Sequence, residues 1–395
     1  MSVPTNESQA DVVVVGCGII GASVAWRAAA TGRSVTVLDP EPGDGATHAA
    51  AGMLAPVSEA TFGEYPLLRL NVASNEMWPT FAAELEAETG GSVGLRRTGT
   101  LGVAYDDGDR RRLLRMLALQ QEWGLQAEEI TVAQARDHEP LLGPRVAGAT
   151  WVTGDHQVDP RAVNRALLQG LAQRGVGVVR ERAVEVVCSA DGSQVRGVRD
   201  ESGTVHASDD VVLAAGWATR ELMDRLDGTS VPTRPVKGQV LRLRPGPSMQ
   251  TPQLGHVVRG LVQDRSVYVV PRADGEVVIG ASSEEQPDDR EITVGATFAL
   301  LRDARALVPG IDELAMTDMT ARARPGSPDN LPIIGPVGPS GLVVATGHYR
   351  DGILLAPLTA EAVCAVLDGG GQAVDLGAAD PNRFMTTQEM VVSAQ

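Results

Sequence analysis

The sequence predicts an α/β fold in which a domain built on a parallel sheet is interleaved with an α+β domain built on a mostly antiparallel sheet. Three observations support this prediction. A strand–helix–strand pattern opens the chain, similar patterns recur in its middle and at its end, and a stretch of alternating apolar and polar residues falls between them. The length of 395 residues suits two such domains better than one.

The opening pattern is a βαβ unit. Asp11 to Val15 predicts a buried strand because its β-branched run stops at Gly16, a helix follows to about Ala30, and Ser34 to Leu38 predicts the second strand. Residues 12–26 carry no charged side chain, a property that membrane spans and signal peptides share. Three glycines break this run and no basic segment precedes it, so we expect neither.

The later elements follow from periodicity. Leu113, Leu114 and Leu117 lie on one side of an amphipathic helix over 109–123, and we interpret the basic run 110–112 as its solvated face. Pro160 suits the first turn of a helix that runs to residue 174. The other expected elements are strands at 176–180, 184–188, 194–199, 211–215 and 343–346, an antiparallel sheet over 232–283, and a last helix over 358–367.

The order of these elements gives the predicted domain boundaries. The parallel-sheet domain takes residues 10–85, 150–222 and 316–370, and the second domain takes 86–149 and 223–315. Residues 1–9 and 380–395 are expected to be flexible tails.

Charge and cysteine content exclude several classes of partner. The net charge of −16, from 34 basic and 50 acidic residues, opposes binding to nucleic acid. The three cysteines are far apart and match no zinc-site or redox spacing, so we expect no metal and a cytoplasmic, reducing location. A homo-oligomer is compatible with the sequence, which gives no oligomeric state.

Residues 16–21 form a GxGxxG motif directly between the first strand and its helix. Gly16 permits the tight turn, Gly18 lets a pyrophosphate approach the backbone, and Gly21 lets helix and strand pack closely. Asp39 ends the second strand, where its carboxylate could accept hydrogen bonds from both ribose hydroxyls and would disfavour the 2′-phosphate of NADP. The unit therefore predicts a Rossmann-type dinucleotide site, rather than a plain glycine-rich turn, without separating FAD from NAD.

Three further segments carry residue types suited to a binding site. The small residues of 46–56 allow a flat ligand to approach, although a small-residue turn is the better explanation of this segment taken alone. Tyr268 lies on a strand face with Ser266 and Val270, where it offers its hydroxyl to a pocket or packs on a sheet. Pro325 forces Arg324 into an extended conformation, and a guanidinium matches a carboxylate with two parallel hydrogen bonds.

The alternatives at the last two segments are structural. Arg324 could equally form a surface ion pair, and we take Arg322 as the structural member of the two arginines. In residues 347–359, Gly347 and Gly352 give a ligand access to backbone N–H groups ahead of a helix, and a plain strand–turn–helix junction is the less favoured alternative once the other motifs are considered.

Together these segments resemble the D-amino-acid oxidase family of FAD-dependent oxidoreductases, most closely its glycine oxidases of thiamine biosynthesis. The resemblance rests on Ala-Gly-Met-Leu-Ala-Pro at 51–56, on the turn at 214–217, on residues 321–335 and on 347–359, and it covers about Asp11 to Leu367. Asp39 departs from the glutamate that these enzymes often carry. Ser266 and Ser283 are expected to line the pocket walls but match no family pattern, so the substrate's size and its stereochemistry stay open.

The resemblance implies noncovalent FAD, because the cysteine that tethers it in the related sarcosine oxidases has no counterpart near residues 324–329. It implies that Arg324 clamps the substrate carboxylate with Tyr268 as helper, and that Met53 and Arg350 also contact the substrate. The residues implied to contact FAD are Gly16, Gly18, Ile19, Ile20, Gly21, Asp39, Pro40, Ala46, Thr47, Ala51, Gly52, Met53, Val184, Gly216, His348, Tyr349, Arg350, Asp351, Gly352, Ile353 and Leu354.

The implied reaction is oxidation of glycine, or of another small amino acid or amine, by hydride transfer from Cα to flavin N5, with no side-chain acid or base. O2 would be the acceptor, giving H2O2, imine or glyoxylate, and ammonia, and the imine would feed the thiazole of thiamine. The alternatives are a D-amino-acid oxidase or dehydrogenase, a sarcosine-type amine oxidase, an NAD-dependent dehydrogenase, and a catalytically silent flavin-binding subunit.

Overall fold

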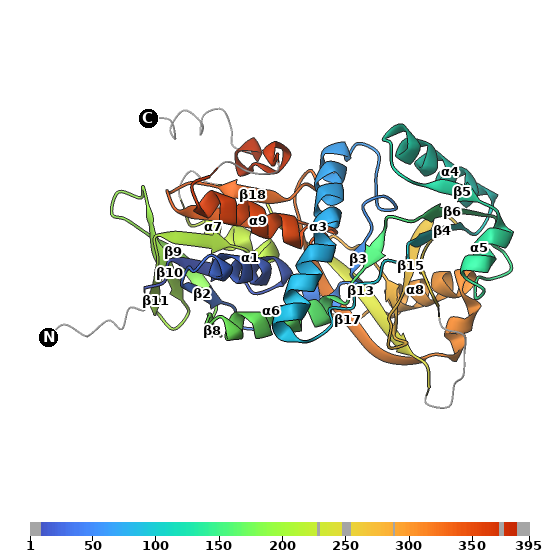
Figure 1. Ribbon diagram of the computed structural model, residues 1–395, viewed down its shortest axis with the longest axis horizontal. Helices are drawn as coiled ribbons and strands as arrows, with labels where there is room; N and C mark the ends of the chain where they lie inside the picture. Colours follow the sequence, from blue (N-terminus) through green and yellow to red (C-terminus); the bar gives the residue numbers. More distant parts are fainter. Residues whose placement is uncertain (1–8, 227–229, 247–253, 287–288, 371–374, 385–395) are drawn as a thin grey trace.

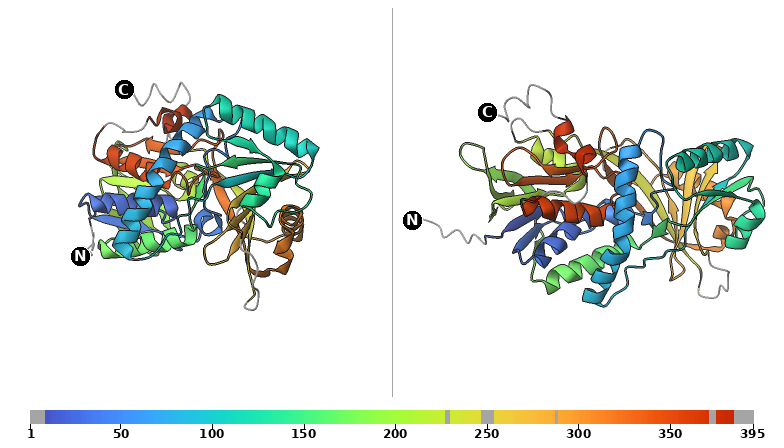
Figure 2. Two further views of the ribbon diagram at one scale, coloured as in Figure 1. Left: turned by 45° about the vertical axis from the view of Figure 1, so that its right-hand side comes forward. Right: turned by 45° about the horizontal axis from the view of Figure 1, so that its top comes forward.

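The computed structural model describes residues 9–226, 230–246, 254–286, 289–370 and 375–384. Two groups of strands lie at opposite ends of an elongated molecule, and the long helix α3 (Tyr65–Thr89) runs between them (Figure 1). The two further views show the same division (Figure 2).

The first group is a six-stranded sheet with the strand order β18–β19–β12–β1–β2–β8. All neighbours are parallel except β18 and β19. The sheet therefore joins segments from the start, the middle and the end of the chain, as the predicted interleaving requires. Its strands are β1 (Val12–Val15), β2 (Val35–Leu38), β8 (Gly177–Val179), β12 (Asp210–Leu213), β18 (Ile333–Pro336) and β19 (Leu342–Thr346).

Both faces of this sheet are buried, which explains the unbroken valine run of β1. Successive side chains on a strand point to opposite faces. Val12 and Val14 belong to a core shared with α1 (Ile19–Ala30), α3, α6 (Pro160–Gln173) and α9 (Ala356–Leu367). Val13 and Val15 face a second core, shared with β9 (Ala183–Cys188), β10 (Val195–Asp200) and α7 (Thr219–Met223). Strands β9 and β10 form a small antiparallel sheet with β11 (Val205–Ala207).

The second group is an eight-stranded sheet with the order β17–β13–β16–β15–β14–β4–β6–β5, antiparallel except where β14 pairs with β4. Helices α4 (Asp107–Glu122), α5 (Val132–His138) and α8 (Val294–Leu307) contact it. Its strands are β4 (Thr100–Ala104), β5 (Glu128–Ile130), β6 (Gly148–Val152), β13 (Arg234–Arg244), β14 (Val257–Val262), β15 (Arg265–Pro271), β16 (Val277–Gly280) and β17 (Ala315–Gly326).

Short elements join the two groups. The helix α2 (Ala46–Ala49) leads into β3 (Met53–Leu54), which pairs with β7 (His156–Gln157). The remaining short turns are the 3-10 helices η1 (Gly216–Ala218), η2 (Pro309–Glu313), η3 (Gly377–Ala379) and η4 (Pro381–Phe384).

The predicted α/β fold class is confirmed, and so are the βαβ unit and the antiparallel character of 232–283. No element was predicted for the residues of α3, which contain Pro79, a residue type that normally ends or kinks a helix. Packing overrides that local signal: Trp78, Phe81 and Leu85 are almost completely buried.

The division into two domains stays a prediction, and hydrogen bonding places two strands differently from the predicted boundaries. Residues 315–326 form β17, which pairs along its length with β13 in the eight-stranded sheet, and β6 belongs to the same sheet up to Val152. The predicted tail 1–9 lies outside the described residues except for residue 9. The other tail lies outside from residue 385 onward, while η4 occupies 381–384.

Candidate functional site

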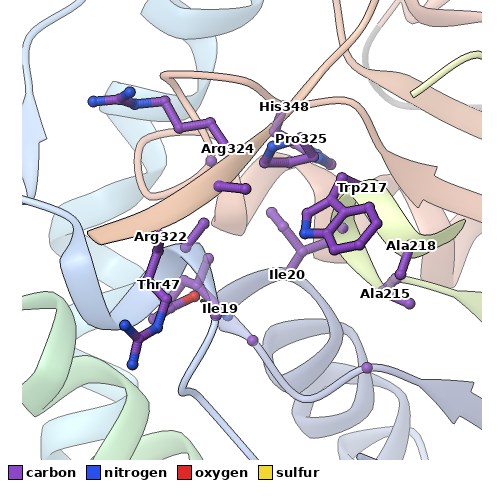
Figure 3. A pocket seen from close by; sticks show the side chains of 18 of the residues that line it. Ile19, Ile20, Thr47, Ala215, Trp217, Ala218, Arg322, Arg324, Pro325 and His348 are labelled. Atoms are coloured by element: carbon purple, nitrogen blue, oxygen red, sulfur yellow. Dashed lines mark hydrogen bonds between the residues drawn. The ribbon is translucent and has the colours of Figure 1, made fainter. Parts of the chain in front are cut away.

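One long pocket, with a volume of about 460 Å³, runs from the glycine turn of the first βαβ unit to the eight-stranded sheet. Its walls come from the N-terminal end of α1, the segment 43–53, β9, η1, β13, β15, β17 and the loop 348–353. Thr47 and Ile19 lie on one side of the pocket and Trp217 and Ala218 on the other, with Ile20 between them (Figure 3).

The glycine turn is shaped for close contact. A Cβ atom on Gly21 would lie 1.9 Å from the carbonyl oxygen of Gly16, so only glycine lets α1 approach the turn. Gly16 has φ +98°, and a Cβ there would lie 2.4 Å from the oxygen of Ala214. Gly18, Ile19 and Ile20 line the pocket, so the helix N-terminus with its partial positive charge opens onto the cavity.

Thr47 and Asp39 fix this turn from outside. The hydroxyl of Thr47 accepts a hydrogen bond from the amide of Ile19 at 2.9 Å, which supplies the cap that Gly18 lacks. Asp39 accepts from the amide of Cys17 at 2.6 Å and from that of Glu41 at 2.8 Å. Its carboxylate lines the pocket and also holds the turn, a role that the sequence did not reveal.

The two arginines of β17 differ in their partners. Arg322 donates to the carbonyl of Asp44 at 2.6 Å and to its carboxylate at 2.8 Å, so its guanidinium is committed to the protein. Among the described residues, Arg324 donates one hydrogen bond, to the carbonyl of Ser282 at 3.1 Å. The two side chains diverge in the pocket (Figure 3). Arg324 therefore keeps donors for a ligand.

Two glycines make room for the neighbouring polar groups. A Cβ on Gly238 would lie 2.3 Å from Nη1 of Arg324, and a Cβ on Gly280 would lie 2.2 Å from the hydroxyl of Tyr268. Both Arg324 and Tyr268 line the pocket. Burial raises the pKa of Tyr268, and the positive charge of Arg324 partly opposes that rise. The phenol is thus neutral and available as a hydrogen-bond donor.

The loop 347–354 closes the pocket under α9. Burial lowers the pKa of His348 to about 3, so this histidine is neutral, and its Nε2 lies 3.0 Å from the hydroxyl of Thr359. The carbonyl of Leu354 accepts from Ser74 at 2.6 Å and from Trp78 at 2.9 Å, which ties the loop to α3.

Arg350 and Asp351 are adjacent ionisable residues in this loop. Arg350 lines the pocket and pairs with Glu64 at 3.0 Å. Asp351 is 4% exposed. Burial, reinforced by the negative charge of Glu59, raises the pKa of Asp351 to about 7. The Asp351 side chain is therefore a buried acid and not part of the pocket wall.

Glu59 is a lining residue that the sequence did not indicate. It lies in the turn at residues 56–59 and pairs with Nη1 of Arg259 at 2.5 Å. Arg259 lies opposite Tyr268 in the β14–β15 ladder. In a sequence, a single glutamate in a turn is normally interpreted as a solvated charge. The partner of Glu59 is distant in the sequence, so no local signal could have identified Glu59 as a pocket residue.

Most of the predicted contact residues do meet in this one pocket, including Met53, Tyr268, Arg324 and Arg350. Three predicted cofactor contacts do not line it. Gly21 packs against the turn, Asp351 is buried behind the loop, and the Leu354 carbonyl faces α3. The residues that do line it are Gly16, Gly18, Ile19, Ile20, Asp39, Pro40, Ala46, Thr47, Ala51, Gly52, Met53, Val184, Gly216, His348, Tyr349, Arg350, Gly352 and Ile353, with Tyr268 and Arg324.

The expectation that Ser266 and Ser283 line the pocket walls is wrong. Both residues are exposed and neither lies on the pocket wall. Ser266 is near the start of β15. Tyr268 and Val270, on the same strand face, pack in a hydrophobic cluster that does not extend to Ser266.

Membrane and metal sites are not indicated in the part of the chain that the structure describes. No helix there combines the length and apolarity that crossing a bilayer requires. No group of three or more histidine, cysteine, aspartate or glutamate side chains there is arranged to hold a metal ion.

Comparison with known proteins gives a consistent result. The family model DAO, "FAD dependent oxidoreductase", matches residues 11–366. The chain is 32% identical over 371 residues to "Glycine oxidase" of Geobacillus kaustophilus, covering 93% of this chain and 95% of that protein. The crystal structure of glycine oxidase from the same organism matches with a TM-score of 0.87 and 30% identity, covering 96% of this chain and 100% of that one.

A second kind of relative is longer. "Bifunctional protein ThiO/ThiG" of Trichormus variabilis is 34% identical over 351 residues, which cover 89% of this chain and 51% of that protein. The chain thus spans about half the length of the bifunctional relatives that it matches.

Proposed function

The chain belongs to the DAO family of FAD-dependent oxidoreductases, and we propose that it oxidises glycine, or another small amino acid or amine, with O2 as electron acceptor. With glycine the products are glyoxylate, ammonia and H2O2, because one water hydrolyses the imine. The single observation that carries the choice of substrate is the guanidinium of Arg324, which lines the pocket with donors uncommitted to the described protein groups.

The pocket fits the cofactor of the family. Only glycine fits at Gly16 and Gly21, and the N-terminus of α1 offers a pyrophosphate its partial positive charge. None of the three cysteines is a lining residue, which supports noncovalent binding. When bound, FAD accepts the two electrons that leave the substrate, which no side chain in the pocket can do.

The substrate carboxylate is proposed to bind Arg324 and Tyr268. A carboxylate accepts two parallel hydrogen bonds from a guanidinium, and the neutral phenol adds a third donor. Gly238 and Gly280 leave the space in which these two side chains lie. Met53 supplies an apolar wall close to them, because it packs in the same cluster as Tyr268.

The other charged side chains that line the pocket concern the amino group of the substrate. Glu59 lines the same end and pairs with Arg259, while Arg350 pairs with Glu64. A carboxylate and a guanidinium at one end match the opposite charges of an amino acid. His348 stays neutral at physiological pH and adds no cation beside Arg324. We therefore assign these residues to binding and orientation and assign no side chain the role of catalytic acid or base.

The names of the relatives support a place in making the thiazole of thiamine. Since the chain spans about half of the bifunctional relatives, that role and any partner in it are part of the proposal. The cytoplasmic location stays a prediction from the sequence.

The proposal is tested by oxygen consumption of the purified, FAD-loaded protein with glycine, sarcosine and D-alanine. We expect glycine to give the highest kcat/KM, with H2O2 and ammonia formed in equal amounts. Turnover of all three only with an artificial acceptor would show a dehydrogenase. No turnover of any of the three under either condition would refute the proposed substrate class.

A further inference from the structure

Two buried arginines, Arg242 in β13 and Arg272 directly after β15, donate hydrogen bonds to neighbouring carbonyls of the pocket segment 50–52. Nη2 of Arg242 donates to the carbonyl of Ala50 at 3.2 Å, and Nη2 of Arg272 donates to the carbonyl of Ala51. The next carbonyl, of Gly52, accepts from the amide of Val158 at 2.9 Å. Three successive carbonyl groups are thus held by partners outside the segment.

Both guanidinium groups have further partners on their Nη atoms. Arg242 is 1% exposed and pairs with Glu276 at 2.7 Å. Arg272 is 7% exposed, and its Nη1 donates to the side chain of Gln157 at 3.0 Å and to the carbonyl of Val158 at 2.6 Å. Burying a charge is costly unless it is paired or hydrogen-bonded, so these contacts keep the arginines in place.

The pocket lies on the other side of the segment. Ala50, Ala51 and Gly52 line the cavity, whereas Arg242 and Arg272 do not. The peptide bonds of this segment are trans. In a trans peptide the N–H points opposite to the carbonyl. A carbonyl drawn toward the arginines therefore turns the N–H groups of Ala51 and Gly52 away from them, and within the described residues neither N–H donates to another protein group.

We propose that Arg242 and Arg272 are positioning residues, which orient the peptides 50–51 and 51–52 so that two N–H groups face the cofactor. This role rests on the proposed binding of FAD in the pocket. Amide N–H groups aimed into a water-poor cavity favour negative charge there and donate to ring acceptors without reorganising. Neither arginine touches the cofactor itself.

Arginine suits this task better than lysine. Arg272 reaches two backbone carbonyls and one side-chain oxygen with a planar fork of donors, which an ammonium group cannot reproduce at the same three positions. Positions 242 and 272 lie far from residues 50–52 in the sequence, and only the packing of β13 and β15 against this segment brings them together.

The test compares Arg242→Gln and Arg272→Gln with a matched control, Arg244→Gln. Arg244 lies two residues along the same strand, pairs with Asp274 at 2.8 Å and with Glu276 at 3.2 Å, and is 42% exposed, but makes no contact with the segment. The dissociation constant of FAD is measured by ultrafiltration of each holoprotein, together with the visible absorption spectrum of the bound flavin and the steady-state kinetics with glycine.

We expect FAD to bind about 10-fold to 100-fold more weakly in both variants, since each loses one or two hydrogen bonds that order the segment. The flavin bands should shift, and kcat should fall more than KM rises because Arg324 is intact. A merely structural loss would leave the bands of the bound flavin unchanged. Arg244→Gln should stay within about twofold of the parent protein.

The outcomes separate this inference from the function on which it rests. If the parent protein holds no FAD, the proposed function fails. If the parent binds FAD and either glutamine variant has the same dissociation constant for FAD and the same flavin spectrum as the parent, the positioning role is overturned. If Arg272→Gln folds, Arg272→Lys, which keeps the charge, should restore less than half of the binding energy that the glutamine variant loses. Should Arg272→Gln not fold, Arg242→Gln decides the question.

Discussion

The two ends of the pocket are built in different ways. At the glycine turn the shape of the backbone makes the site, and the residues that matter lie within a few positions of one another. At the other end the side chains of Glu59, Tyr268, Arg324 and Arg350 come from four separate segments, and their charges make the site. The first end depends on space for a ligand, and the second depends on hydrogen-bond donors and charge.

The largest effect is expected from filling the space at the turn. A methyl group on Gly21 would lie 1.9 Å from backbone that cannot move away, so Gly21→Ala should abolish FAD binding and lower the free energy of unfolding by about 3 kcal/mol. Flavin absorbance and thermal unfolding measure both. The control is Gly177→Ala in β8, where an added Cβ meets nothing within 4 Å. Equal behaviour of the two variants would contradict the steric account.

Removing charge at the other end should spare the cofactor. Arg324→Met is expected to lower kcat/KM for glycine by about 100-fold to 1000-fold, the loss for a charged hydrogen-bonded pair, while FAD stays bound. Arg322→Met serves as the comparison, because its guanidinium is committed to Asp44. That variant should lose thermal stability and keep its KM within a few-fold. Similar kinetics in both variants would remove the distinction between the arginines.

A smaller effect is expected when only a neutral donor is lost. Tyr268→Phe removes one hydroxyl above Gly280 and should raise KM for glycine about 10-fold, which corresponds to roughly 1.4 kcal/mol. Steady-state kinetics at fixed O2 measure the change. A KM equal to that of the parent would mean that the phenol only packs against the sheet.

The remaining prediction concerns stability rather than activity, at the buried acid behind the loop. Because the pKa of Asp351 is raised to about 7 in the folded protein, the folded state keeps a proton that the unfolded chain loses near pH 4. Its contribution is full below that pH and disappears as the pH rises through 7.

The corresponding variant is Asp351→Asn, which cannot ionise. Between pH 4 and pH 7 the parent should lose stability relative to the variant, by about 1 kcal/mol per pH unit and on the order of a few kcal/mol in all. Denaturant unfolding at several pH values measures the difference. A constant gap across this range would mean that Asp351 is ionised throughout.

The contrast between the two ends also explains what could be predicted from the sequence. The turn at 16–21 and the acid at 39 are local, since strand, glycines and helix lie in one short stretch, and the structure assembles them as expected. The second role of Asp39, as acceptor for the amide of Cys17, needed coordinates. The sequence pattern gives the number of residues between the glycine turn and Asp39, but it does not give the direction in which the Asp39 carboxylate points.

At the substrate end the local signals were weaker and some were misleading. Arg324 could be singled out because Pro325 fixes its backbone. The prediction that Arg322 is structural and Arg324 binds the ligand agrees with their different hydrogen-bond partners. Strand alternation placed Ser266 on the same face as Tyr268 and so predicted that both line the pocket, but Ser266 is exposed near the start of the strand. Glu59 gave no signal, because its partner Arg259 is set by the sheet's topology.

The most direct test of the account is anaerobic mixing of the FAD-loaded protein with glycine, followed by flavin absorbance, in the parent and in Arg324→Met. The account predicts that glycine bleaches the flavin of the parent rapidly and that of the variant at least about 100-fold more slowly at the same low concentration. Methylamine, which lacks the carboxylate, should bleach both at the same slow rate. Equal bleaching of parent and variant by glycine, or no bleaching of the parent, would contradict it.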